Sequence, residues 1–254
     1  MIVELFGPSG VGKTTLSHGI KSVLETRGFS VRLNSSARPS EKACHEQACH
    51  EQARRPVLKH YFGGLTSPMS RGLKAIDAIG SLVGQRSPDE PAAELLTLLP
   101  DVSFPTQLRY RRYLSSLGTS WAQAMNQDEI AIFDQAYLSA LCSIGNLGGS
   151  TSSSLRRAFD TLPRPDLLVI LSADRALIKE RLLERLKRQS ILERMFELDL
   201  TSTLKQSDIA ANITDWVKSS NREDIVLMSG RDDPEINGRA IAGLVEARLA
   251  RSAV

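Results

Sequence analysis

The sequence predicts a three-layer α/β/α domain around a five-stranded parallel sheet, with a mainly helical insert and an arginine-rich lid. Three observations favour this fold class. Short, continuous apolar runs recur along the chain and have the length of buried parallel strands. Amphipathic stretches with helical spacing separate these runs. The first run leads through a glycine-rich turn straight into such a stretch, and a strand, a turn and a helix in this order begin a β-α-β unit, whose strands are parallel.

The individual elements follow from the apolar spacing and from the residues that end each run. We predict strands at residues 2–6, 29–33, 130–133, 166–171 and 224–228. We predict helices at residues 13–27, 92–99, 105–125 and 201–217, one beginning after Asp174 and one beginning at Pro234. Gly28 and Pro100 are typical of helix ends. The polar run at residues 148–154 predicts a flexible loop.

The composition is that of a soluble globular protein, with 41% hydrophobic and 24% charged residues. The net charge of +3 permits anionic substrates but does not by itself indicate nucleic-acid binding. Three cysteines are too few, and odd in number, for a disulfide framework, so a reducing cytoplasm is the simplest compartment. No apolar run is long enough to span a membrane. Because the first predicted strand begins at residue 2, we expect no signal peptide.

The glycine-rich turn carries the pattern G-x-x-x-x-G-K-[ST] of a phosphate-binding loop. Its glycines allow a tight turn whose backbone N–H groups point at phosphate oxygens, and the N-terminus of the next helix favours an anion. Lys13 can reach the β- and γ-phosphates, and the Thr14 hydroxyl can bind Mg²⁺. The predicted nucleotide-binding residues are Gly7, Ser9, Gly10, Val11, Gly12, Lys13, Thr14 and Thr15. A glycine-rich turn without a ligand is the alternative.

Asp134 directly follows the apolar strand at residues 130–133, at the edge where open α/β sheets bind their ligands. After a phosphate-binding loop, a carboxylate at this place can hold Mg²⁺, usually through water, or orient an attacking hydroxyl. Asp134 and Thr14 are therefore the predicted metal ligands. The alternative for Asp134 is an ordinary helix cap at the end of a strand.

An arginine stripe marks the helix after Asp174. Arg181, Arg185 and Arg188 fall at steps of four and three, so they share one face, whereas the opposite stripe is apolar. Guanidinium groups suit a polyphosphate because their donors form a fork. The alternative is an exposed helix laced by ion pairs. The turn at residues 230–233 follows the last strand, so we expect it to be able to meet a nucleotide base.

Residues 34–104 contain a tandem duplication, in which Ala-Cys-His-Glu-Gln occurs at 43–47 and again at 48–52. Two cysteines and two histidines so close together invite a zinc interpretation. An offset of five residues, however, turns a side chain by about 140° on a helix, and no second ligand pair follows with zinc spacing. We expect a polar helical insert. The basic residues downstream either bind an acidic acceptor or are solvated surface charges.

The order of these parts resembles the nucleoside and nucleotide kinase group of P-loop proteins. It is most similar to thymidylate kinase-like proteins, over most of the chain except roughly residues 40–100. Besides the loop and the arginine stripe, the segments that carry the resemblance are Leu108-Arg109-Tyr110-Arg111-Arg112, Phe133-Asp134-Gln135-Ala136-Tyr137-Leu138-Ser139, Arg164-Pro165-Asp166 and Gly230-Arg231.

The resemblance implies ATP and Mg²⁺ as cofactors. Its implied catalytic residues are Lys13, Asp134, Arg181 and Arg185; its further nucleotide contacts are Arg188 and Arg231; its acceptor contacts are Arg38, Arg111, Arg112, Gln135 and Tyr137. Two departures from the family pattern lie on the acceptor side. Gln135 stands where the family has an arginine after the aspartate, and Ala37-Arg38-Pro39 stands where it has Arg-Glu-Pro. We therefore expect an acceptor other than ordinary thymidylate.

The sequence thus predicts one P-loop kinase-like domain over residues 1–254, with a core of 1–33 and 105–254, a helical acceptor-side insert at about 34–104 and a lid at about 175–198. The expected activity moves the γ-phosphoryl group of ATP·Mg to a nucleotide, a nucleoside or another small hydroxyl compound. Two alternatives stay open. One is a nucleotide-dependent switch or hydrolase acting through a protein partner, although a guanine-selecting N-K-x-D sequence is absent. The other is a kinase for a modified base in DNA, so nucleic acid is an optional partner. No membrane partner is expected, and a homodimer stays open.

Overall fold

A computed structural model of the chain describes residues 1–34, 90–188, 200–220 and 222–252. Five parallel strands form one sheet in the order β2-β3-β1-β4-β5. The strands are β1 (Ile2–Phe6), β2 (Val31–Asn34), β3 (Ile130–Phe133), β4 (Leu167–Ser172) and β5 (Ile225–Ser229). In register, Glu4 of β1 lies opposite Phe133 of β3 on one side and Leu168 of β4 on the other. The first strand is therefore central, and its neighbours follow much later in the chain.

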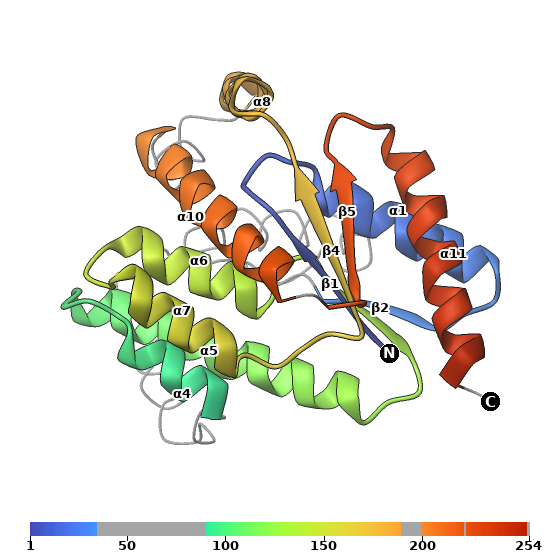
Figure 1. The fold of residues 1–254 in the computed structure, drawn as a ribbon, viewed down its shortest axis with the longest axis horizontal. Helices are drawn as coiled ribbons and strands as arrows, with labels where there is room; N and C mark the ends of the chain where they lie inside the picture. Colours follow the sequence, from blue (N-terminus) through green and yellow to red (C-terminus); the bar gives the residue numbers. More distant parts are fainter. Residues whose placement is uncertain (35–89, 189–199, 221, 253–254) are drawn as a thin grey trace, which may run out of the picture.

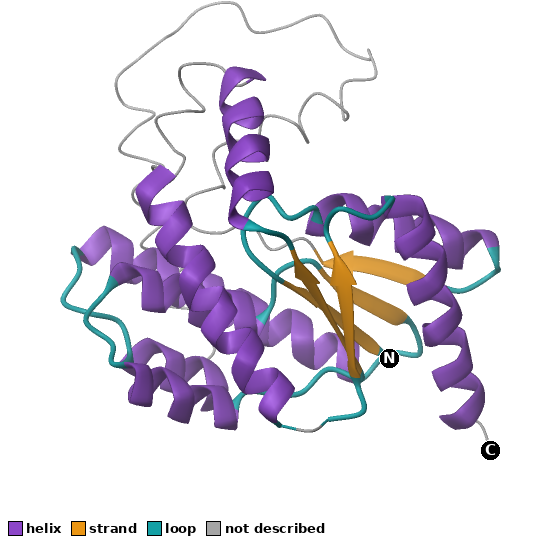
Figure 2. Cartoon of the chain, turned by 45° about the horizontal axis from the view of Figure 1, so that its top comes forward, coloured by secondary structure: helices purple, strands orange, loops and turns teal. Residues whose placement is uncertain are grey.

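Helices cover both faces of this sheet (Figure 1; Figure 2). Helices α1 (Lys13–Thr26) and α11 (Pro234–Ser252) pack together on one face. The other face carries α4 (Glu90–Thr97), α5 (Phe104–Met125), α6 (Tyr137–Leu147), α7 (Ser152–Thr161) and α10 (Leu200–Ser219). Helix α8 (Arg175–Arg188) rises from the carboxyl end of β4. The predicted three-layer α/β/α fold class with a five-stranded parallel sheet is confirmed.

Two hydrophobic clusters hold the layers together, and the alternation of β1 explains the division. Val3 and Leu5 point into the cluster with α1 and α11, whereas Ile2 and Phe6 point into the cluster with α5, α6 and α10. Successive side chains of a strand point to opposite faces, so a continuous apolar run serves both clusters at once. Glu4 is the one charged residue of β1, and alternation places it on the α5 and α6 face.

Most predicted elements are confirmed within one or two residues, but two helices were not predicted. Helix α6 has no readable amphipathic period because every residue from Tyr137 to Gly145 is buried. The prediction of a flexible loop at 148–154 is wrong in its second half, since α7 begins at Ser152. The Thr151 hydroxyl accepts a hydrogen bond from the Ser154 backbone N–H at 3.2 Å, as expected of an N-cap threonine.

The predicted insert and lid are described only in part. Helix α4 matches the helix predicted at 92–99, and it packs against α5, α6 and α7. Residues 35–89, with the Cys-His-Glu-Gln duplication, lie outside the described residues, as do residues 189–199 of the predicted lid. Among the helices that the structure describes, none is long and apolar enough to cross a membrane.

Candidate functional site

The glycine-rich loop connects β1 to α1 at the centre of the sheet. Because β3 and β4 flank β1, this loop lies at the point where the strand order reverses, the usual ligand position in open α/β sheets. Gly12 has a φ of 107°, in the left-handed region that favours glycine. A Cβ on Gly7 would lie 2.4 Å from the Leu171 carbonyl oxygen, so no larger residue fits against β4. Local geometry thus accounts for the glycines of the pattern.

Lys13 begins α1 and is only 7% exposed. Its Nζ donates hydrogen bonds to the carbonyl oxygens of Gly7, at 2.7 Å, and Pro8, at 2.9 Å. The ammonium group therefore lies against the backbone of the loop that precedes it. A charged donor at this place can exchange carbonyl oxygens for phosphate oxygens with little movement of the chain.

Thr14 and Asp134 meet at the carboxyl edge of the sheet although 120 positions separate them in the sequence. The Thr14 hydroxyl donates to Asp134 Oδ2 at 3.4 Å, and Asp134 is 4% exposed. A hydroxyl and a carboxylate oxygen are hard ligands of the kind that Mg²⁺ prefers, with water completing its shell. The residues present therefore fit the predicted metal. No group of three or more His, Cys, Asp or Glu side chains that could hold a metal occurs among the described residues.

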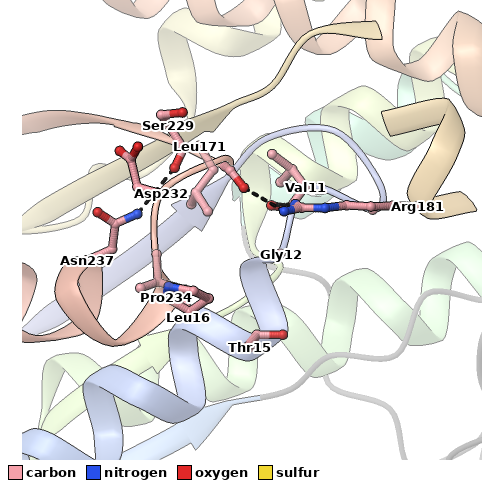
Figure 3. A pocket seen from close by; sticks show the side chains of 12 residues that line it. Val11, Gly12, Thr15, Leu16, Leu171, Arg181, Ser229, Asp232, Pro234 and Asn237 are labelled. Carbon is pink, nitrogen blue, oxygen red and sulfur yellow. Dashed lines mark hydrogen bonds between the residues drawn. The ribbon is translucent and has the colours of Figure 1, made fainter. Parts of the chain in front are cut away.

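A cavity of about 210 Å³ adjoins the loop (Figure 3). One wall comes from the loop and the start of α1, and the other comes from the turn between β5 and α11. The lining residues are Gly10, Val11, Gly12, Thr15, Leu16, Leu171, Arg181, Ser229, Gly230, Asp232, Pro234 and Asn237. The turn predicted to meet a base thus lies beside the predicted phosphate cradle. Its walls are partly apolar and partly polar, which suits a nucleoside.

Asn237 is a lining residue that the sequence analysis missed. It is 8% exposed, and its Nδ2 donates to the Ser229 carbonyl oxygen at 3.2 Å, which fixes the turn between β5 and α11. The signal available in the sequence is its position one helical turn after Pro234, on the same face of α11.

The arginine stripe is described at its first member only. Arg181 is half-buried, and it donates from Nη1 to the Val11 carbonyl oxygen at 3.0 Å and from Nη2 to the Gly230 carbonyl oxygen at 2.8 Å. Arg185 and Arg188 belong to α8, but their side chains lie outside the described part of the chain. Ile178 and Leu182, two residues of the apolar stripe of α8, are buried.

Arg231, predicted to contact the nucleotide, points elsewhere. Its guanidinium forms an ion pair with Asp174 at the start of α8, and it does not line the cavity next to Gly230 and Asp232. Asp174 also accepts a hydrogen bond from the Leu177 N–H at 2.8 Å, so it caps α8. The Leu177 hydrogen bond and the Arg231 guanidinium hold the pKa of Asp174 below its ordinary value.

Of the predicted acceptor residues that the structure describes, one is enclosed in the core and three are at least partly exposed. Tyr137 has no exposed surface, and its ring meets Trp121 edge-on with centroids 5.4 Å apart, so the structure places it in the core instead of on an acceptor surface. Arg111 and Arg112 are exposed on α5, and Gln135 is half-buried after Asp134. Arg38 lies outside the described residues. Tyr137 turns inward because α6 begins there and buries its whole first turn.

Glu4 is a second buried acid near the centre of the sheet. It is 1% exposed, and its Oε1 accepts a hydrogen bond from the Leu138 N–H at 3.1 Å, in the first turn of α6. Burial raises the pKa of Glu4 to about 8, and the Leu138 hydrogen bond and the Arg222 charge offset the effect only in part. Its other carboxyl oxygen has no hydrogen-bond partner within the described part of the chain. Glu4 is therefore mainly neutral at pH 7.

No protein-family model matches the sequence, and no curated protein matches it. Among solved structures, a deoxyadenosine kinase from M. mycoides, with the product dCMP and a flexible dCDP bound, is similar over 97% of this chain and 100% of that chain. Its TM-score is 0.49 and its sequence identity is 13%. A likeness of this degree identifies neither substrate nor mechanism.

Proposed function

We propose that the chain is an ATP-dependent phosphotransferase, which moves the γ-phosphoryl group of ATP·Mg to a nucleotide, a nucleoside or another small hydroxyl compound. The observation that carries the proposal is the meeting of Thr14 and Asp134 at 3.4 Å beside a loop with glycines at positive φ. A phosphate-binding loop alone indicates a bound nucleotide. A hydroxyl and a buried carboxylate together at its mouth add a place for the metal that phosphoryl transfer requires.

Different residues of the site would bind the phosphates, hold the metal and neutralise the charge of the transferred group. Backbone N–H groups of residues 7–15 bind the phosphates, and Lys13 moves from the Gly7 and Pro8 carbonyl oxygens to the β- and γ-phosphates. Asp134 holds the metal, directly or through water, or orients the attacking hydroxyl. When bound, Mg²⁺ neutralises charge on the phosphate oxygens. Arg185 and Arg188 keep their predicted role as lid arginines that neutralise phosphate charge.

The cavity between the loop and the turn after β5 supports a nucleoside as the other half of the donor. Base and ribose would lie beside Gly12, Thr15 and Gly230, continuous with the phosphates. The exposed Arg111 and Arg112 of α5 would supply positive charge for an acidic acceptor. We retain an acceptor other than ordinary thymidylate, because Gln135 removes a cation next to Asp134. Core, insert and lid would form one kinase domain.

The test uses the full chain with Mg·ATP and a mixed pool of nucleosides, nucleotides and sugars, and it detects phosphate addition by mass. The variant is Lys13→Met, which keeps the apolar stem of this buried side chain and removes its ammonium group. Transfer should fall at least about a hundredfold, as is usual when a group that stabilises transferring charge is removed. Lys218→Met, on the exposed face of α10, is the matched control and should behave as the wild-type chain does.

Other outcomes would direct attention to the alternatives. ATP hydrolysis that no acceptor stimulates, together with tight binding of a protein partner, would favour a nucleotide-dependent switch. Salt-sensitive binding to DNA would favour a polynucleotide acceptor. Undiminished transfer in Lys13→Met would contradict the role given to Lys13.

A further inference from the structure

Arg181 joins two segments that are distant in the sequence and adjacent in space. Its guanidinium donates to the Val11 carbonyl oxygen of the loop at 3.0 Å and to the Gly230 carbonyl oxygen of the turn after β5 at 2.8 Å. Figure 3 shows its side chain reaching from α8 to the gap between these segments. The loop and the turn are the two walls of the cavity. Arg181 therefore bridges the walls directly.

The walls approach closely at this bridge. A Cβ added to Gly230 would lie 2.9 Å from the Val11 carbonyl oxygen, and the Gly230 N–H donates to the Ser172 carbonyl oxygen at 2.7 Å. Glycine is therefore needed where the turn meets the loop. The position of this contact sets the width of the cavity, and the Arg181 guanidinium supports it from the side of α8.

A second link crosses in the opposite direction. Arg231 leaves the turn and pairs with Asp174, which also caps α8 through the Leu177 N–H at 2.8 Å. A side chain of α8 thus binds the turn, and a side chain of the turn binds the start of α8. The two links together fix the position of the turn relative to α8.

The chemistry of the bridge requires arginine. A guanidinium presents several N–H donors in a fixed fork, so it can serve two carbonyl oxygens at once, whereas a lysine ammonium is a point charge on a flexible stem. The two acceptors of Arg181 belong to two different segments, whereas both acceptors of Lys13 belong to the loop itself. Arg181 therefore joins the two walls of the cavity, which Lys13 does not.

We propose that Arg181 is a positioning residue for the nucleoside half of the donor site, which holds the loop and the turn after β5 at the separation that base and ribose require. It is not a contact of the transferred phosphate. This inference rests on the proposed function, because it presumes that the cavity receives the nucleoside of ATP. It assigns to Arg181 a role in selecting a nucleoside triphosphate over a bare polyphosphate.

The test compares two ligands on the full chain by calorimetry or, for the weaker one, by competition with ATP. Mg·ATP has phosphates and a nucleoside, whereas Mg·tripolyphosphate has phosphates only. In Arg181→Met the dissociation constant for Mg·ATP should rise about tenfold, as expected when pre-organisation of a site is lost, and that for Mg·tripolyphosphate should change less than about twofold. The matched control is Arg175→Met, an exposed arginine of the same helix; it should change neither value.

Other changes in the two dissociation constants would overturn the proposal. Equal weakening of both ligands would overturn the proposal and make Arg181 a phosphate contact, and unchanged binding of both would also overturn it. If Arg181→Met does not fold, Arg181→Lys takes its place: it keeps the charge but cannot span both carbonyl oxygens, so the selective loss of Mg·ATP should persist, and full recovery of Mg·ATP binding would contradict the bridge. A wild-type chain that binds no Mg·ATP would instead refute the proposed function.

Discussion

Polar residues that are close in the sequence have opposite environments on the two faces of the sheet. Asp134 reaches Thr14 of α1, at the mouth of the glycine-rich loop. Three residues later, Tyr137 lies wholly inside the core against Trp121 of α5. Glu4 shares that face, where it is enclosed and accepts the Leu138 N–H of α6. Polar groups thus gather at the sheet edge beside α1 and are enclosed by the helices on the side of α5 and α6.

This difference shows what makes a polar residue available to a ligand. Proximity to the carboxyl end of a strand is common to Asp134 and Tyr137. What separates them is the next element, because α6 starts at Tyr137 and buries its entire first turn. On the α1 side, the glycine-rich loop takes the place of such a helix turn and leaves room beside the strand ends.

The largest effect that sharpens this comparison is expected for Asp134→Asn, which keeps the shape of the side chain and removes its charge. An amide oxygen is a weaker ligand for a hard cation than a carboxylate. Transfer activity should fall about a hundredfold, and the Mg²⁺ concentration for half-maximal rate should rise. Initial rates across a Mg²⁺ titration measure both. Asp208→Asn, at an exposed site on α10, is the control; an unaltered Mg²⁺ dependence in Asp134→Asn would mean that Asp134 holds no metal.

The same comparison explains which features the sequence could predict. The glycine pattern fixes a backbone shape through steric rules, so the loop was predicted at the residues where it occurs. The strands at residues 2–6 and 130–133 have the predicted bounds. A short, continuous apolar run is typical of a parallel strand that is buried on both faces, so its ends are easy to recognise in the sequence. Thr14 and Asp134 were expected at the same edge of the sheet, because Asp134 follows an apolar strand and Thr14 ends the glycine-rich loop, and they lie 3.4 Å apart.

The direction of helix side chains was harder to predict from the sequence than the positions of the loop and the strands. Helix α6 lacks an amphipathic period because it is buried on all sides, and the inward turn of Tyr137 depends on that unpredicted helix. Arg181 was correctly placed on the arginine face of α8, but its two carbonyl partners come from a loop and a turn far away in sequence. Such contacts are set by tertiary packing, which local spacing does not encode.

A second, smaller effect is expected on the pH dependence of stability, because Glu4 is buried on the sheet face that α5 and α6 cover. Burial raises the pKa of Glu4 from 4.5 to about 8, so the carboxyl binds its proton more tightly in the folded chain than in the unfolded one. Stability from this group is therefore complete below pH 4.5 and is lost as the pH rises through 8. Between pH 5 and pH 9 the wild-type chain should lose about 2 kcal/mol of unfolding free energy relative to Glu4→Gln, since local relaxation absorbs part of the full shift.

Urea unfolding at several pH values measures this difference. Glu223→Gln, at an exposed position just before β5, is the control and should follow the wild-type curve. Parallel curves for the wild-type chain and Glu4→Gln would show that water reaches Glu4, and the contrast between the two faces would then be weaker than the structure indicates.

The smallest effect is expected for Tyr137→Phe, which removes a hydroxyl from a ring that has no exposed surface. The resemblance to nucleotide kinases predicts an acceptor contact here, whereas burial against Trp121 predicts a packing role. With packing dominant, kcat/KM should change less than about twofold, and the unfolding free energy should fall by about 1 kcal/mol, the usual net value of one hydrogen bond. Tyr113→Phe, another buried tyrosine of the same core cluster, is the matched control. A tenfold loss of kcat/KM in Tyr137→Phe alone, at unchanged stability, would instead require the first turn of α6 to open and present Tyr137 to the acceptor, and the division between the two faces would then be a property of one conformation of the chain.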